Sequence, residues 1–166
     1  MARLHLRTAI AGYGHIFPPE APPPTLDEVL AQWRQWLGAD RAVGRRGFVA
    51  DDGTGLLGVV LAGPDPIEEG AGHIARLYVD RDQWGRGIGT LLYQAAIAYL
   101  VDRGFREATL WVLEANDRAR WWYERLGWRP TGERKAVYPP AAIDDLRYRV
   151  TLAPVTGGPR NIVSDR

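Results

Sequence analysis

The sequence predicts a single α/β (α+β) domain, with helices on both faces of a mixed, mostly antiparallel central sheet. Segments with helical spacing of apolar residues alternate with short β-rich segments, which is the pattern of a layered domain of this class. The length of 166 residues fits one domain, and 46% hydrophobic with 25% charged residues can form a buried core. We expect residues 1–152 to form the domain and residues 153–166, which lack periodicity, to form a flexible C-terminal tail.

Two helices are expected before the first predicted strand. Apolar residues at helical spacing predict a helix within residues 1–16. Five prolines between positions 18 and 24 then predict an extended connector. Thr25 and Glu28 form a capping box, which marks the start of a second helix that ends near Gly38.

The rest of the chain alternates predicted strands and helices. A β-hairpin is expected within residues 48–62, with its turn at residues 51–55. Gly104 and Gly127 stand where they can end a long helix and a short one. The further expected elements, in chain order, are a strand at 73–79, a helix at about 87–103, a strand at 108–113, a helix at 116–126, and strands at 128–133 and 146–152.

Charge and composition exclude several functions. The 21 Lys+Arg against 20 Asp+Glu give a net charge of +1, so neither nucleic acid nor a membrane surface is an expected partner. The absence of cysteine excludes disulfides, a thiolate nucleophile and cysteine-ligated zinc. The three histidines lack metal-ligand spacing, so no metal is expected. The chain has no secretory-signal pattern and no run of about 18 apolar residues, which predicts a cytoplasmic protein.

A glycine-rich turn follows the predicted strand at 73–79. Gly85, Gly87 and Gly89 alternate immediately before a predicted helix, so backbone N–H groups and the helix N-terminus can together form a cradle for a pyrophosphate. A dinucleotide-binding fingerprint fits less well, because Thr90 stands where its third glycine belongs, and the Gly-Lys-Ser/Thr of a P-loop is absent. The alternative is that the glycines only allow a tight connection between strand and helix.

A second motif follows the strand predicted at 108–113. With the glycine turn, it resembles the GCN5-related N-acetyltransferase (GNAT) superfamily, and the resemblance extends over residues 47–152. The family's Q/R-x-x-G-x-G/A motif matches residues 84–89, with Trp84 in place of Gln or Arg. Its N-x-x-A-x-x-x-Y-x-x-x-G-F motif matches Asn116, Ala119, Tyr123, Gly127 and Trp128, with Trp128 in place of Phe.

The resemblance implies acetyl-CoA as co-substrate, held in a wedge where the strand before the glycine turn diverges from the next parallel strand. The pyrophosphate would meet the glycine turn, the pantetheine would follow the strand before it, and Asn116 would bond the pantetheine. The implied cofactor-binding residues are Leu77, Tyr78, Val79, Trp84, Gly85, Arg86, Gly87, Ile88, Gly89, Thr90, Asn116 and Ala119. Side chains that could reach the phosphates are Arg81, Arg86, Arg118 and Arg120.

The implied reaction is direct attack of an amine on the thioester, with Tyr123 protonating the departing thiolate and a backbone N–H such as that of Val79 stabilising the oxyanion. The residue that acts as general base and takes the proton from the amine is not decided by the resemblance. His73 takes the position of the family's catalytic glutamate, and strand alternation places it on one face with Ala75, Leu77 and Val79. The competitors for the role of base are Glu114, Glu68 and Glu69.

The predicted acceptor is a primary amine of a small molecule or a peptide. Glu68, Glu69 or Glu114 near aromatic residues would favour a cationic amine. The aromatic residues and histidine expected around the acceptor are Tyr13, His15, Phe17, Trp33, Trp36 and Tyr138.

Two alternative functions and a homodimer also remain compatible with the sequence. The functions are a ribosomal-protein-type N-terminal acetyltransferase and a non-catalytic acyl-CoA-binding module. The family usually has a strand before its first helix. The helical spacing near Met1 predicts that this chain begins at or inside that helix, so the first strand is expected to be short or missing. A homodimer could complete the sheet edge.

Overall fold

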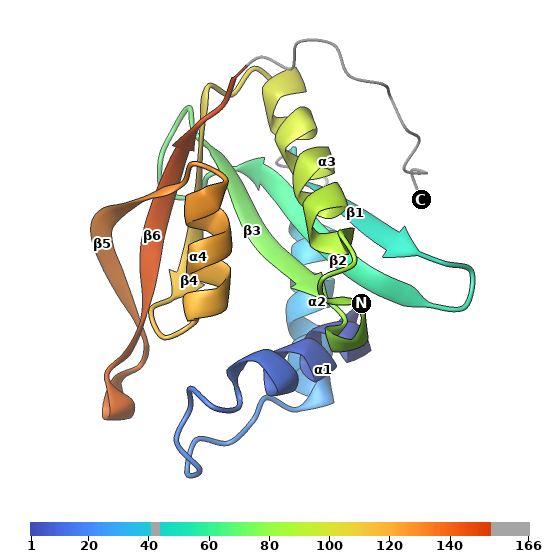
Figure 1. The fold of residues 1–166 in the computed structure, drawn as a ribbon, viewed down its shortest axis with the longest axis vertical. Helices are drawn as coiled ribbons and strands as arrows, with labels where there is room; N and C mark the ends of the chain where they lie inside the picture. The colour runs from blue at the N-terminus through green and yellow to red at the C-terminus, as the bar shows by residue number, and fades with distance from the viewer. Residues whose placement is uncertain (41–43, 154–166) are drawn as a thin grey trace.

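The computed structural model describes residues 1–40 and 44–153, so the predicted tail lies outside the described residues except for Ala153. The chain forms one six-stranded sheet in the order β1-β2-β3-β4-β6-β5, with helices on both faces (Figure 1). The helices are α1 (Ala2–Tyr13), α2 (Leu26–Asp40), α3 (Ile88–Asp102) and α4 (Asp117–Arg125). The strands are β1 (Arg46–Asp51), β2 (Leu56–Pro64), β3 (Gly72–Val79), β4 (Glu107–Leu113), β5 (Arg129–Tyr138) and β6 (Ile143–Thr151).

The sheet is mixed and mostly antiparallel, which confirms the predicted fold class. Only β3 and β4 run parallel, and the other four neighbouring pairs are antiparallel. Within the described residues the first strand of the sheet follows two helices, as expected. No helix among these residues is long and apolar enough to cross a membrane.

Two apolar cores lie on opposite faces of the sheet. Helices α3 and α4 pack on one face over Val60, Ile74, Leu110 and Tyr148. Helices α1 and α2 pack on the other face, over the β2–β3 half of the sheet. Helix α3 lies in front of the sheet in Figure 1, and α2 lies behind it. The remaining half of the α1/α2 face, formed by β4, β6 and β5, carries charged side chains instead of a helix.

The boundaries differ from the prediction mainly in the last hairpin. Strand β5 extends to Tyr138 and β6 begins at Ile143, joined by the 3-10 turn Pro139–Ala141. Strand β5 is exposed along almost its whole length. Its residues therefore lack the apolar alternation by which a sequence reveals a strand.

Strand β3 contains a β-bulge that changes which side chains share a face. Leu61 of β2 pairs with Arg76, but the next residue, Ala62, pairs with Ile74, so Ala75 has no partner on β2. As a result Ala75 and Arg76 both face α2, whereas Leu77 packs with Ile74 in the α3/α4 core.

The alternation predicted for this strand is therefore wrong. His73 and Ala75 lie on the α1/α2 face, and Leu77 and Val79 lie on the α3/α4 face. The extra residue of the bulge shifts the strand's period of two by one position.

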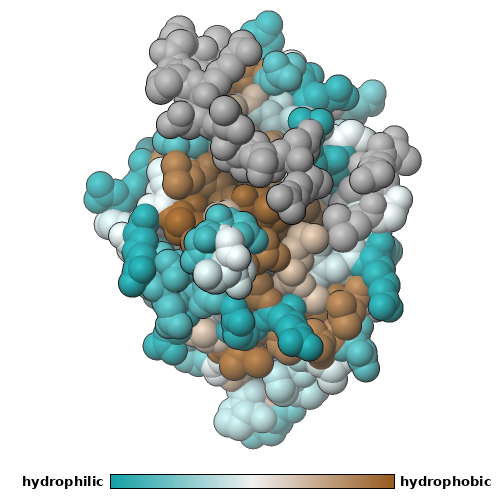
Figure 2. Space-filling view, turned by 90° about the vertical axis from the view of Figure 1, so that its right-hand side faces the viewer, coloured by the Kyte–Doolittle hydropathy of each residue, from teal (hydrophilic) through white to brown (hydrophobic). Residues whose placement is uncertain are grey.

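The edge strand β1 pairs only with β2 among the described strands. The side of the molecule at the right of Figure 1 shows apolar residues near its centre, surrounded by hydrophilic ones (Figure 2). The homodimer, which would complete the sheet edge, stays a prediction.

Gly58 allows the N-terminal half of α3 to lie directly on β2. A Cβ at this position would stand 2.7 Å from Leu92 Cδ1 and 3.0 Å from the Tyr78 carbonyl oxygen. The Leu92 side chain would have to shift, and β2 would have to give way against the backbone of β3, to which the Tyr78 carbonyl belongs.

We therefore expect Gly58→Ala to lower the free energy of unfolding by about 1–3 kcal/mol, since it overpacks a closed contact. Gly55→Ala is the matched control, because a Cβ there meets no atom within 4 Å. Urea unfolding of both variants measures the difference, and equal losses would contradict the close approach of α3 to β2.

Candidate functional site

A wedge opens where β3 separates from β4. The parallel pairing covers only Gly72↔Ala108, His73↔Thr109 and Ile74↔Leu110. Beyond these pairs β3 continues to Val79 and β4 to Leu113, and the two strands no longer pair with each other. The Asp80 N–H donates to the Leu57 carbonyl oxygen of β2 (2.8 Å), so by strand alternation the Val79 N–H points to the other side, into the wedge.

The glycine turn lies at the end of β3. Gly85 and Gly87 have φ values of 80° and 84°, and Gly87 is the N-cap residue of α3. Within the described residues, no hydrogen bond uses the N–H groups of Gly85, Gly87, Ile88, Gly89 or Thr90 as donors. A helix N-terminus with free N–H groups attracts anions, so this turn can hold a phosphate without a basic side chain.

Trp84 joins this turn to the strand and to α4. Its indole N–H donates to the Val79 carbonyl oxygen (2.9 Å), and the Arg118 guanidinium carbon lies 4.0 Å from its ring centroid. Arg118 therefore lies beside the turn, and Arg86 is part of the turn itself. Arg120 is instead held by the Glu114 carbonyl oxygen (2.9 Å) and the Tyr148 hydroxyl (3.1 Å).

Helix α4 begins and ends with residues of the second motif. The Asn116 side-chain oxygen accepts a hydrogen bond from the Ala119 N–H (3.2 Å), so Asn116 caps the helix. Tyr123 is buried two turns along, with its ring 5.8 Å from that of Trp128.

The Tyr123 hydroxyl is buried and protonated. It makes no hydrogen bond with any described residue. Burial, with smaller contributions from Tyr13, Tyr93 and Tyr78, raises its pKa well above the usual value of a tyrosine. The hydroxyl therefore stays protonated at neutral pH.

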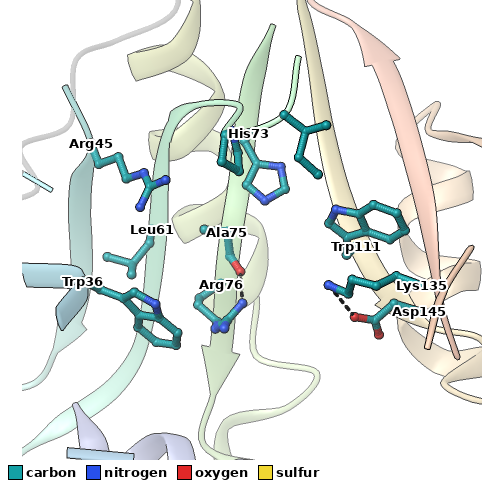
Figure 3. A pocket seen from close by; sticks show the side chains of 11 residues that line it. Trp36, Arg45, Leu61, His73, Ala75, Arg76, Trp111, Lys135 and Asp145 are labelled. Atoms are coloured by element: carbon teal, nitrogen blue, oxygen red, sulfur yellow. Dashed lines mark hydrogen bonds and ion pairs between the residues drawn. The ribbon is translucent and has the colours of Figure 1, made fainter. Parts of the chain in front are cut away.

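A pocket of about 270 Å³ lies on the α1/α2 face beside the wedge (Figure 3). It is bounded by Trp36 of α2 on one side and Trp111 of β4 on the other. Its other lining residues are Arg45, Leu61, Pro66, Ile67, His73, Ala75, Arg76, Lys135 and Asp145.

His73 lines this pocket and is oriented by a buried network. Its Nδ1 lies 2.8 Å from the Thr109 Oγ1, which in turn bonds the Asp65 carboxylate. Because a carboxylate only accepts, the Thr109 hydroxyl donates to Asp65 and accepts from His73 Nδ1–H. This arrangement leaves the lone pair of the ring on Nε2.

Asp65 is held in the charged state by several donors. Burial raises its pKa, but hydrogen bonds from Thr109, from the N–H groups of Ile67 and Glu68, and from Arg147 bring it below the usual value. The Arg147 guanidinium lies 2.7 Å from the Asp65 carboxylate. For His73, burial lowers the pKa to about 4, so the ring is neutral at pH 7.

The acidic residues considered as bases are not in the pocket lining. Glu114 pairs with Arg134, and Glu68 pairs with Arg147 and Arg149. The carboxylate that does line the pocket is Asp145, which lies 3.3 Å from the Lys135 ammonium group. Burial raises the Asp145 pKa, and Lys135 opposes this effect.

Most of the pocket lining was missed by the sequence reasoning, including the charged residues Arg76 and Asp145. Asp145 falls just before the strand predicted at 146–152, and Arg76 falls on the opposite face from His73 by simple alternation. Ile74 and Leu77 are both apolar but lie three positions apart, so strict alternation would place them on opposite faces of the strand. This break in the alternation could have suggested the bulge.

The comparisons with known proteins agree with this geometry. Residues 10–128 match the acetyltransferase (GNAT) family, and the chain belongs to this family. The chain is 36% identical over 83 residues to N-alpha-acetyltransferase 30 of Schizosaccharomyces pombe, which covers 48% of the chain and 55% of that protein. It is 48% identical over 54 residues to an uncharacterized N-acetyltransferase of Methanocaldococcus jannaschii, covering 32% of the chain.

The chain thus spans about half of the first relative and 24% of the second. A solved structure with the same fold is the PaiA N-acetyltransferase from Thermoplasma acidophilum in complex with coenzyme A. It has a TM-score of 0.66 and 14% identity, and the superposition covers 90% of this chain and 89% of that chain.

The buried state of His73 predicts a pH dependence of stability. The folded pKa of about 4 lies below the ordinary value of 6.5, so between these values the unfolded chain binds a proton that the folded chain does not. The stabilisation is fully present above pH 6.5 and is lost as the pH falls towards 4.

We expect His73→Asn, which retains a donor for Thr109, to reduce the slope of unfolding free energy against pH near pH 5 by about 1.4 kcal/mol per pH unit. Urea unfolding at several pH values measures this slope. His15→Asn, on an exposed segment, is the control. The same change in both variants would refute the assignment to His73.

Proposed function

We propose that the protein is an N-acetyltransferase that transfers the acetyl group of acetyl-CoA directly to a primary amine. The observation that carries this proposal is the set of free N–H groups of Gly85, Gly87, Ile88, Gly89 and Thr90, at the end of the strand that lines the wedge. A thioester bound along the wedge would have its pyrophosphate at the glycine turn and its acetyl group near the pocket.

In the proposed binding mode, the pyrophosphate accepts hydrogen bonds from the backbone between Trp84 and Thr90, with the Arg118 guanidinium nearby. The pantetheine follows the unpaired edge of residues 77–79 and passes the start of α4 at Asn116 and Ala119. Because Asn116 uses its side-chain oxygen to cap α4, its amide nitrogen is the group left for the pantetheine.

In the proposed reaction, the amine nitrogen attacks the thioester carbonyl carbon and forms the new C–N bond. The carbonyl oxygen takes up negative charge, for which the Val79 N–H is a donor. The C–S bond then breaks, and the Tyr123 hydroxyl gives its proton to the departing thiolate.

The proton lost by the amine goes to a base, for which His73 is our candidate. Its Nε2 carries a lone pair, and its ring lines the pocket. Glu114 is a weaker candidate, because its carboxylate pairs with Arg134 away from the pocket lining.

Acetyl-CoA is expected to raise the melting temperature, and Gly87→Ala is expected to weaken its binding about 10–100-fold, as loss of hydrogen bonds to a charged group would. The added Cβ lies at the phosphate cradle, and the φ of 84° disfavours alanine. Isothermal titration calorimetry measures the affinity.

Gly104→Ala is the matched control. Gly104, just past the C-terminal end of α3, has a φ of 88° and also has open space around its Cβ position. Both variants carry a similar backbone penalty of about 1–2 kcal/mol. Equal affinities in the two variants would reject the cradle.

Tyr123→Phe is expected to lower kcat about 10²-fold or more, because the thiolate loses its proton donor, with the affinity for acetyl-CoA unchanged. A thiol-release assay measures the rate. Tyr99→Phe is the control, since that hydroxyl binds the Gly44 carbonyl oxygen near the far end of α3. Full activity in Tyr123→Phe would remove Tyr123 from the mechanism.

A second candidate function is N-terminal acetylation of a peptide. It is favoured by the similarity to the relative named N-alpha-acetyltransferase 30. Acetylation of peptide N-termini in preference to free small amines would support it. Stabilisation by acetyl-CoA with no thiol release for any amine would instead support a non-catalytic acyl-CoA-binding module.

A further inference from the structure

Resting on the proposed function, we propose that the amine acceptor also carries a carboxylate, and that Arg76 binds this carboxylate in the pocket beside the wedge. The acceptor class is then a small amino acid or a similar amine with an acid group.

The position of Arg76 is the first reason. The bulge turns its side chain towards α2, into the same pocket that His73 and Ala75 line. Without the extra residue, Arg76 would follow the alternation of Ile74 into the α3/α4 core, where a guanidinium could not be solvated. The bulge therefore places a cation on the strand that lines the wedge.

The partners of Arg76 are the second reason. One guanidinium nitrogen, Nη1, donates to the Ala75 carbonyl oxygen (2.8 Å), and the guanidinium carbon lies 4.0 Å from the Trp36 ring centroid. These contacts hold the side chain in place. Nε is buried, so the group that can meet a ligand is Nη2, which makes no hydrogen bond with a described residue. Burial raises the Asp145 pKa and the nearby Arg76 charge opposes this effect, but the Asp145 carboxylate pairs with Lys135, and no described carboxylate forms an ion pair with Arg76.

This isolation distinguishes Arg76 from the neighbouring arginines of the same sheet face. Arg147 and Arg149 are each bound by two or more carboxylates. A guanidinium binds a planar carboxylate through two of its N–H groups. Arg76 is fixed by stacking, its Nη2 makes no hydrogen bond with a described residue, and the nearby Asp145 forms its ion pair with Lys135 instead. Its guanidinium is therefore suited to bind an acid that comes with the ligand.

The remaining charges of the pocket agree with a ligand of mixed charge. Lys135 and Asp145 pair with each other at 3.3 Å, so their charges largely cancel. Figure 3 shows Arg76 between Trp36 and this pair. The sequence-based expectation of a cationic acceptor stays a prediction, and the proposed site adds a positive charge for an acid group on the same ligand. A volume of about 270 Å³ suits a ligand of amino-acid size.

The test uses two matched acceptor pairs that differ only in the carboxylate next to the amine: phenylalanine against phenethylamine, and glutamate against 4-aminobutyrate. The thiol-release assay should give the wild-type protein a higher kcat/KM for the member with the carboxylate next to the amine. In Arg76→Gln, the ratio of kcat/KM for acid over matched amine should fall by about 30-fold or more.

Two further variants complete the design. Arg76→Lys retains the charge without the planar pair of donors, so its ratio should lie between those of wild type and Arg76→Gln. Arg34→Gln, an exposed arginine of α2, is the control and should leave the ratio unchanged. Circular dichroism checks that each variant is folded.

A binding measurement covers the case in which no acceptor of the panel is turned over. N-acetylphenylalanine should bind the protein–CoA complex in calorimetry, and Arg76→Gln should weaken that binding at least 10-fold. The carboxylate site is overturned if the amines without a neighbouring carboxylate match the amino acids as substrates. It is also overturned if neither the kcat/KM ratio nor product binding depends on Arg76.

The outcomes separate this inference from the proposed function. Thiol release only with amines that lack the neighbouring carboxylate retains the acetyltransferase and rejects the carboxylate site. Failure of acetyl-CoA to bind at all rejects the proposed function itself.

Discussion

The separation of β3 from β4 after three parallel pairs is the constraint on which the candidate site depends. While two strands are paired, their facing N–H and C=O groups satisfy each other and leave no room for a ligand. Once the pairing ends, the edge of β3 is free up to the glycine turn. The bulge at Ala75 and Arg76 lies at this point. One backbone irregularity therefore coincides with both the opening of the wedge and the entry of Arg76 into the pocket.

The charges of the chain are arranged in two different ways around this wedge. On the charged half of the sheet, each carboxylate of the Asp65 network has a donor, and the network fixes the orientation of His73 through Thr109. At the glycine turn, the attraction for an anion comes from N–H groups and the helix N-terminus. A net charge of +1 is consistent with this arrangement, because neither feature requires an excess of basic residues.

Local sequence signals predicted the elements well wherever a single face of each element is buried. The capping box at Thr25 and Glu28 is present, with the Thr25 N–H 2.7 Å from the Glu28 carboxylate. Gly87, Gly104 and Gly127 have positive φ at the ends of helices, as their positions indicated. The hairpin of β5 and β6 was predicted too short, because exposed strands carry no apolar alternation. The face of His73 was predicted wrongly, because a bulge depends on the pairing with β2.

The sequence by itself determined the fold class and the two motifs, and through them the family, because turn glycines, caps and apolar spacing act between residues that are near one another in the chain. Only the tertiary structure decided the composition of the pocket. Trp36, Arg76, Trp111 and Asp145 come from α2, β3, β4 and β6, and no local rule relates them. Their meeting depends on strand order and register, which are set by the packing of the whole sheet.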